Sequence, residues 1–185
     1  MNSELFAVID TETNWENELM SLGAVVADSS FRIVDKLYAV IPEAAVKGGM
    51  FSGALKRVRP DAVVSRKKAV MLADGFLRGH GVEAIFAYNA LFDLGQLPEL
   101  GDRRWYDVMR IAAYRQYNPH LTEAMGLCST GRLKRGYGVE NVLRLISRDP
   151  TYRESHNALL DARDELTIMR LLAHPPEVYE KARIN

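Results

Sequence analysis

The chain has 185 residues, 48% of them hydrophobic, and its 24 basic residues balance its 24 acidic residues. These values predict one globular domain, residues 1–185, with a sizeable core. Zero net charge argues against a broad electrostatic binder of nucleic acid, but it permits an enzyme with a local basic patch. The single cysteine, Cys128, excludes an intrachain disulfide and a multi-cysteine zinc site.

The sequence starts without a basic, apolar leader, since Glu4 precedes a short apolar run that ends in Asp10. None of its apolar runs has the length needed to span a bilayer. We therefore expect a soluble, cytoplasmic protein with no membrane partner.

Strands are predicted in the first part of the chain. Residues 5–10 begin with an apolar run without alternation, which is typical of a strand buried on both faces. Residues 20–27 and 31–41 form the next two predicted strands, joined by a turn at 28–30. Together they predict a three-stranded meander that ends at Pro42.

Helices and strands alternate in the remainder of the chain, after a glycine-containing loop over residues 47–53. The predicted elements are a helical region over 62–78, a strand over 83–88, a short helix over 89–97, a short strand over 105–107 that continues into a helix to about 116, and helices over 139–146 and 157–173. This order predicts a mixed sheet with helices packed on it.

Two carboxylates, Asp10 and Glu12, stand at the end of the first predicted strand. Residues i and i+2 of an extended chain point to the same side, so these acids should lie together. Like charges held close raise each other's pKa unless a cation lies between them. The pair is therefore a candidate divalent-metal site, with a solvated turn as the alternative.

Two further acids occur in structured contexts. Asn89 and Asp93 share one face of the short helix after the fourth strand, and that helix is apolar enough to be largely buried. Its one acid then needs a partner or a rim position, or it complements the helix dipole. Asp161 lies at the edge of the core-facing side of the last helix and could point back toward Asp10. His156 precedes that helix, where a capping or surface role is the alternative to a catalytic one.

Taken in chain order, the motifs D-x-E, N-x-x-F-D and H-x4-D resemble those of the DEDDh 3′–5′ exonucleases of the ribonuclease H-like superfamily. Proofreading exonuclease subunits, oligoribonuclease and ribonuclease T are members of this family. The matching residues are Asp10 and Glu12 in the first motif, Asn89, Phe92 and Asp93 in the second, and His156 and Asp161 in the third. A sister branch has tyrosine at the position of Asn157, so the histidine branch fits.

The resemblance covers about residues 5–173 and implies a ribonuclease H-like α/β fold. Its central five-stranded mixed sheet would combine a three-stranded antiparallel meander with two parallel strands, flanked by helices. Three positions depart from many relatives, which have Thr-Gly near Asn14-Trp15, an acid near Ser21 and histidine at Tyr88. None is a catalytic position, but they put in doubt any transfer of substrate preference.

The resemblance also implies a mechanism. Asp10, Glu12, Asp93 and Asp161 would hold two divalent cations, Mg²⁺ or Mn²⁺, about 4 Å apart. His156 would be the general base. The activity would be hydrolysis of phosphodiester bonds at the 3′ end of single-stranded RNA or DNA, with release of 5′-mononucleotides.

Five residues near the motifs are candidates for substrate binding: Thr11, Thr13, Trp15, Asn89 and Phe92. Trp15 and Phe92 could stack on terminal bases, with core packing as the alternative for each. A basic loop over 131–136 and a basic cluster within 56–68 could contact phosphates, although solvated surface is their default interpretation.

Other functions stay open. A non-catalytic nucleic-acid-binding module with the same fold is the main alternative, disfavoured because all five catalytic positions are intact. A haloacid-dehalogenase-like phosphatase is disfavoured because it needs aspartate where Glu12 stands. The sequence leaves RNA versus DNA, substrate length and pathway undecided, and a homodimer, as in several relatives, is equally open.

Overall fold

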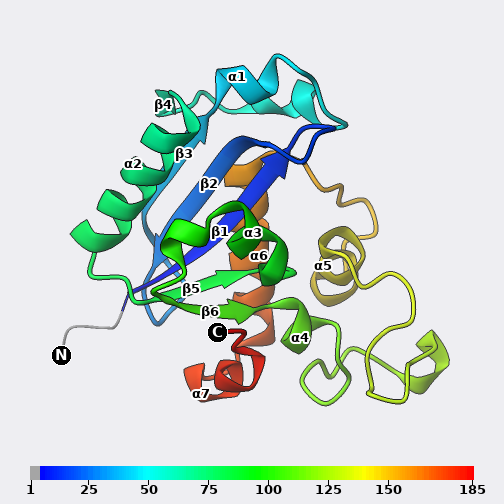
Figure 1. Ribbon diagram of the computed structural model, residues 1–185. Coiled ribbons are helices and arrows are strands. Elements are labelled where there is room, and N and C mark those ends of the chain that lie inside the picture. Colours follow the sequence, from blue (N-terminus) through cyan, green and yellow to red (C-terminus); the bar gives the residue numbers. More distant parts are fainter. Residues whose placement is uncertain (1–4) are drawn as a thin grey trace.

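A six-stranded mixed sheet with strand order β4-β3-β2-β1-β5-β6 runs through the protein (Figure 1). The computed structural model describes residues 5–185. The strands are β1 (Phe6–Thr13), β2 (Leu19–Ala27), β3 (Ile33–Val40), β4 (Ala62–Val63), β5 (Ala84–Ala87) and β6 (Arg104–Asp107). Strands β1, β2 and β3 form the antiparallel meander, β5 and β6 continue parallel to β1, and β4 is parallel to β3.

The mixed sheet confirms the predicted fold class, but it has one strand more than expected. The prediction placed residues 62–63 in a helical region, whereas they pair with Ala39 and Val40 of β3. The amide of Val64 continues this pairing by donating to the Val40 carbonyl at 3.0 Å. Pairing with a distant strand leaves no local sequence signal, so the edge strand was missed.

The helix predicted after the fifth strand is also much shorter than expected. Helix α4 (Met109–Ala112) ends well before residue 116. The buried side chain of Asn118 donates to the Ala112 carbonyl at 2.7 Å and so satisfies an acceptor at the helix end. An asparagine that binds the backbone in this way favours a turn over continued helix.

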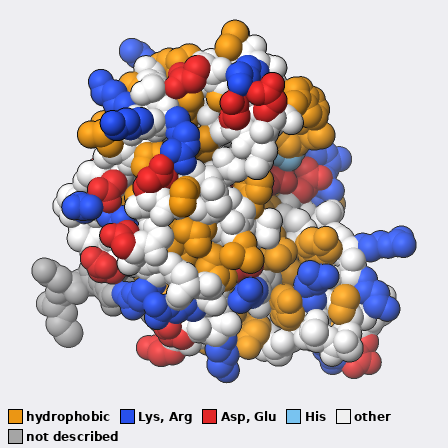
Figure 2. Space-filling view, viewed as in Figure 1, with side chains coloured by type: hydrophobic (Ala, Val, Ile, Leu, Met, Phe, Trp, Pro, Cys, Tyr) orange, Lys and Arg blue, Asp and Glu red, His pale blue; other side chains and the backbone are white. Residues whose placement is uncertain are grey.

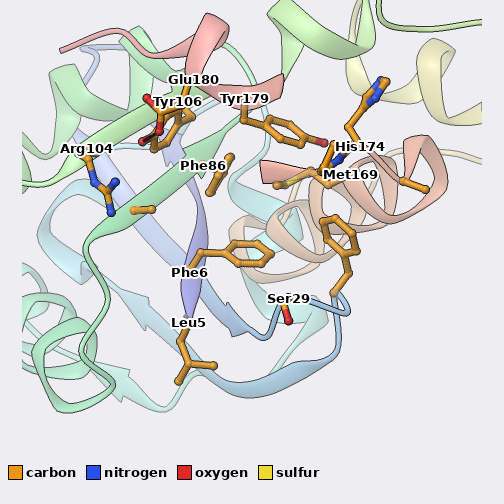
Figure 3. Close-up of a pocket in the computed structure, with 14 residues that line it drawn as sticks. Leu5, Phe6, Ser29, Phe86, Arg104, Tyr106, Met169, His174, Tyr179 and Glu180 are labelled. Atoms are coloured by element: carbon orange, nitrogen blue, oxygen red, sulfur yellow. Dashed lines mark hydrogen bonds between the residues drawn. The ribbon is translucent and has the colours of Figure 1, made fainter. Parts of the chain in front are cut away.

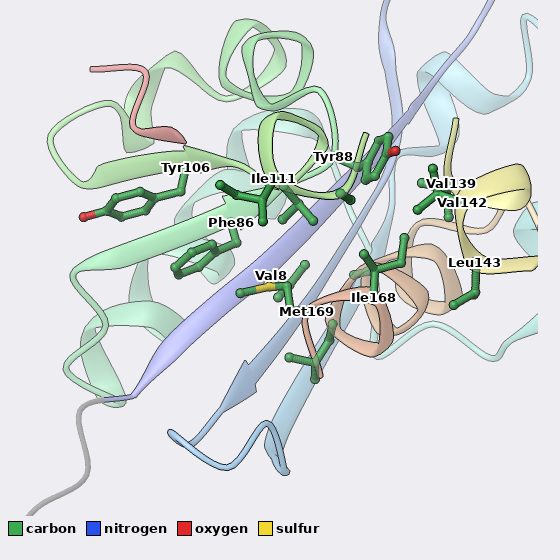
Figure 4. Packing of buried hydrophobic residues seen from close by; sticks show 14 of the residues in the cluster. Val8, Phe86, Tyr88, Tyr106, Ile111, Val139, Val142, Leu143, Ile168 and Met169 are labelled. Carbon is green, nitrogen blue, oxygen red and sulfur yellow. The ribbon is translucent and has the colours of Figure 1, made fainter. Parts of the chain in front are cut away.

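Helices cover both faces of the sheet (Figure 1). They are α1 (Pro42–Ala45), α2 (Arg66–Gly79), α3 (Ala90–Gln96), α4, α5 (Val139–Ser147), α6 (Ala158–Leu172) and α7 (Pro176–Tyr179). Alternation along β1 sends Val8 into the core under α5 and α6, and Ala7 and Ile9 into the core under α2. Figure 4 shows the first of these cores, with Val8 between Phe86 and Met169 of α6.

The start of α6 is held against the sheet. Its N-cap, Asn157, accepts from the Leu160 amide and donates to the Tyr38 hydroxyl and the Ala54 carbonyl. Beneath this first turn lies Gly23 of β2, where an added Cβ would stand 2.2 Å from backbone atoms of Ala158. Only glycine allows the helix to sit this close to the strand.

Across the part of the chain that the structure describes, no helix is both long and apolar enough to cross a membrane.

We expect Gly23→Ala to destabilise the protein by at least ~2 kcal/mol, since a methyl group there must push α6 off the sheet. Gly75→Ala is the matched control, because a Cβ at that α2 position meets nothing within 4 Å. Replacing a mid-helix glycine should stabilise by roughly 0.5–1 kcal/mol. Urea unfolding measures both changes, and a neutral Gly23→Ala variant would contradict the close approach.

Candidate metal centre

The first two acids belong to β1 itself. The strand continues to Thr13, further than predicted, so Asp10 and Glu12 are paired in the ladder with Gly23 and Ser21 of β2. The alternative of a solvated turn is therefore wrong. Asp10 and Glu12 share the Val8 side of the sheet, which is the side that α6 covers.

The third acid, Asp93, is buried on helix α3, although large apolar residues of that helix are exposed. Its side chain is 2% exposed, whereas those of Leu91 and Phe92 are 59% and 41% exposed. The Thr11 hydroxyl donates to Asp93 Oδ1 at 2.7 Å and fixes the carboxylate beside β1. The prediction that this helix is largely buried is wrong, because α3 caps the strand ends and packs mainly through Ala90 and Asp93. Figure 2 shows hydrophobic side chains at the surface where α3 lies.

The turn before α3 is shaped by Asn89. This exposed residue has a left-handed backbone, with a φ of 65°, which asparagine tolerates better than most residues. Its amide donates to Asp107 Oδ1 at 2.9 Å. This hydrogen bond holds the turn against the end of β6, and the position of the turn fixes the position of Asp93 on α3.

The third motif completes a cluster with the first. One ligand atom from each of Glu12, His156 and Asp161 lies within 4.8 Å of the others, an arrangement that could hold a metal ion. The Ser155 hydroxyl donates to Asp161 Oδ1 at 3.0 Å. As predicted, His156 precedes the last helix rather than lying on it. Figure 2 shows acidic side chains next to a histidine on the side where α5 lies.

His156 is held by an aromatic stack. Its ring lies 3.6 Å, centroid to centroid, from that of Phe51 at an interplanar angle of 13°. Its backbone has a φ of 53°, so both ring and main chain are in a constrained position. Burial lowers the pKa of His156, which favours the neutral imidazole near pH 7.

The acids repel one another. Burial, followed by the charges of neighbouring acids, raises the pKa of Asp10 well above its ordinary value and that of Glu12 to about 8. Burial likewise raises the pKa of Asp93 to about 7 and that of Asp161 to about 6. No ion pair found among residues 5–185 compensates these four carboxylates with a basic side chain.

A divalent cation fits this environment. Within the described part of the chain, Asp10 Oδ2 is buried and has no hydrogen-bond partner. Buried acceptors are normally satisfied, so this oxygen lacks a partner that a cation would supply. Carboxylate oxygens are the hard ligands that Mg²⁺ and Mn²⁺ prefer.

Sequence reasoning missed several residues of the site. Glu165 follows Asp161 by one helical turn and is 1% exposed, and its i+4 spacing was the signal available. Glu154 lies close enough for burial and the Asp161 charge to raise its pKa to about 7. Phe51 offered no signal, since it is far from the motifs in sequence.

The predicted substrate-binding residues differ in exposure. Thr11 is buried and its hydroxyl is engaged with Asp93, while Thr13 is half-buried. Trp15 is 69% exposed, so core packing is wrong for Trp15 as well as for Phe92. Substrate contact by these residues and by Asn89 stays a prediction.

A separate apolar cavity of about 390 Å³ lies at the opposite end of the sheet, where β1, β5 and β6 begin. Figure 3 shows Phe6, Phe86, Tyr106 and Tyr179 around it, with the Tyr106 hydroxyl donating to Glu180 at 2.7 Å. None of the four motif carboxylates lines this cavity. It is therefore distinct from the candidate metal centre.

The raised pKa values predict a pH-dependent stability. Between the ordinary pKa near 4.5 and the folded value of about 8 for Glu12, the folded protein holds more protons than the unfolded chain. In chelator, this group's contribution should therefore fall as pH rises from about 4.5 to about 8. Asp161→Asn should make this loss of stability smaller, because it removes one acid and weakens the repulsion on the other acids. Thermal unfolding at several pH values measures this, and an equal pH slope in both proteins would contradict the charge crowding.

Comparison with known proteins supports the fold. No protein-family model and no curated protein sequence gives a significant match. Among solved structures, the zinc-bound Escherichia coli exonuclease I–single-stranded DNA complex matches with a TM-score of 0.60 at 14% identity, covering 97% of this chain and 42% of that one. The same enzyme with an oligonucleotide gives 0.64 at 12% identity, with the same coverage.

A moderately thermophilic exonuclease I from Methylocaldum szegediense gives a TM-score of 0.60 at 12% identity, covering 96% of this chain and 42% of that one. The chain thus spans less than half the length of these neighbours. At such identities the likeness concerns the fold, and it confirms the predicted ribonuclease H-like α/β architecture.

Proposed function

We propose that the protein is a metal-dependent 3′–5′ exonuclease of the DEDDh type, which releases 5′-mononucleotides from single-stranded nucleic acid. The observation that carries the proposal is the cluster of Glu12, His156 and Asp161, next to the unpartnered oxygen of Asp10. Buried acids without a compensating basic residue are costly unless cations neutralise them. The exonuclease I neighbours share the fold in which this proposal places the cluster.

Each motif residue has a separate role in the proposed reaction. Asp10 would contribute to both cation positions, Glu12 and Asp161 to one, and Asp93 to the other. When bound, two divalent cations stabilise charge on the attacking and leaving oxygens. One ring nitrogen of His156 would accept the proton of the attacking water as its oxygen bonds to phosphorus and the bond to the 3′ oxygen breaks. The lowered pKa of His156 keeps the ring available as a base.

The exposed aromatic residues suit a single-stranded end. Trp15 follows the acids of β1 in the chain, and Phe92 directly precedes Asp93, so each is close in sequence to a proposed ligand. Stacking on exposed rings holds bases without reading their sequence. Because complexes of the neighbours contain single-stranded DNA, an oligodeoxynucleotide is the first substrate to test, with RNA alongside. A non-catalytic binding module would bind such a strand without turnover.

We expect the protein to shorten a 5′-labelled oligonucleotide progressively in Mn²⁺ or Mg²⁺, and to release the label of a 3′-labelled one at once. Chelator should stop both reactions. Asp161→Asn should remove activity with little loss of stability, because relief of charge crowding offsets lost contacts. Asp164→Asn is the control, since Asp164 lies on the same helix as Asp161 and its carboxylate accepts from the Tyr152 hydroxyl. Absence of metal-dependent shortening on both DNA and RNA would disprove the proposal.

Phe51 should matter through the position of His156. We expect Phe51→Ala to lower kcat by about 10- to 100-fold with little change in KM, since a misplaced base slows proton transfer more than binding. Phe51→Tyr keeps a stackable ring and should retain most activity. Met50→Ala, at the exposed neighbouring position, serves as the control. Steady-state kinetics on one oligonucleotide measures these effects. Equal losses of kcat in the alanine and tyrosine variants would show that the Phe51 ring does not act by stacking on His156.

A further inference from the structure

We propose that Glu165 is a fifth acidic residue of the metal centre, on the side of Asp10 and Asp93, an inference that rests on the proposed function. The four motif acids account for the metal ligands that the resemblance implies. Glu165 lies outside those motifs, and its side chain is among the most buried acids of the described chain.

The position of Glu165 follows from its place on α6 and from one hydrogen bond. It lies one turn after Asp161 on the same face of α6, the face that packs on β1 and β2. Its Oε2 accepts from the Tyr88 amide at 3.0 Å, at the point where β5 ends. Tyr88 directly precedes the turn at Asn89 that leads into α3 and Asp93, so the Glu165 carboxylate lies between α6 and the β5–α3 turn.

The electrostatic surroundings agree with this placement. Burial, followed by the charge of Asp93, raises the pKa of Glu165 well above its ordinary value, and the charge of Glu165 contributes to the raised pKa of Asp10. Glu165 forms no ion pair with a basic side chain within the described residues. A cation at the Asp10 side would compensate all three carboxylates together.

A purely structural role for Glu165 is the competing explanation. The Tyr88 amide needs an acceptor, and a neutral glutamine could supply it without adding charge beside Asp93. A negative charge there is unfavourable beside the other buried acids, and a bound cation would make it favourable. The Oδ2 of Asp10, which is buried without a hydrogen-bond partner, is an acceptor that the same cation would satisfy.

Two substitutions separate charge from hydrogen bonding. Glu165→Gln keeps an acceptor for the Tyr88 amide but removes the negative charge, whereas Glu165→Ala removes both. Asp164→Asn is the matched control, since it removes one charge from the adjacent position, whose carboxylate is engaged with Tyr152. The full chain, Mn²⁺ alone and isothermal titration calorimetry are used, with thermal unfolding in chelator to check the fold.

We expect Glu165→Gln to weaken at least one Mn²⁺ site by about 10- to 100-fold, the range for residues that support metal ligands. In chelator, Glu165→Gln should unfold no earlier than the wild type, while Asp164→Asn should bind Mn²⁺ like the wild type. Unchanged Mn²⁺ affinities in Glu165→Gln would overturn the inference and leave Glu165 a structural acceptor. Nuclease activity of the wild type, measured separately, then shows whether the proposed function still stands.

Discussion

The close seating of helix α6 on strand β2 is the constraint on which the site depends. It exists because Gly23 has no side chain beneath the first turn of the helix, and because Asn157 ties that turn to Tyr38 and Ala54. Gly23 also stands opposite Asp10 in the β1–β2 ladder. Because α6 packs this closely on the sheet at Gly23, the acids of α6 lie near Asp10 of β1.

Charge crowding is the direct consequence of this seating. Asp10, Asp93, Asp161 and Glu165 come from three elements whose backbone positions are fixed by the sheet and its helices, so they cannot separate to relieve repulsion. Burial weakens their contact with water, and every one of these acids has a raised pKa. The folded chain thus retains an unfavourable charge arrangement that binding of divalent cations would make favourable.

Helix α3 buries its acid and exposes large apolar side chains, whereas an ordinary surface helix does the opposite. The acid faces inward to Thr11, and the large apolar residues Leu91 and Phe92 face solvent. A helix that only stabilised the fold would bury its apolar residues and expose its acid. Such local conflict with the usual pattern is expected where residues are retained for function.

Sequence alone determined the features that depend on local pattern. Strand β2 and helix α6 were found because burial imposes a run or a period on neighbouring residues. The motif acids were singled out because they stand at a strand end and near helix starts, in an order that resembles that of a known family. Tertiary structure alone decided that residues 62–63 form an edge strand, that Phe51 stacks on His156, and that Glu165 accepts a hydrogen bond from the Tyr88 amide. These contacts join residues far apart in the chain, whose proximity arises only when the sheet forms and α6 closes over Gly23.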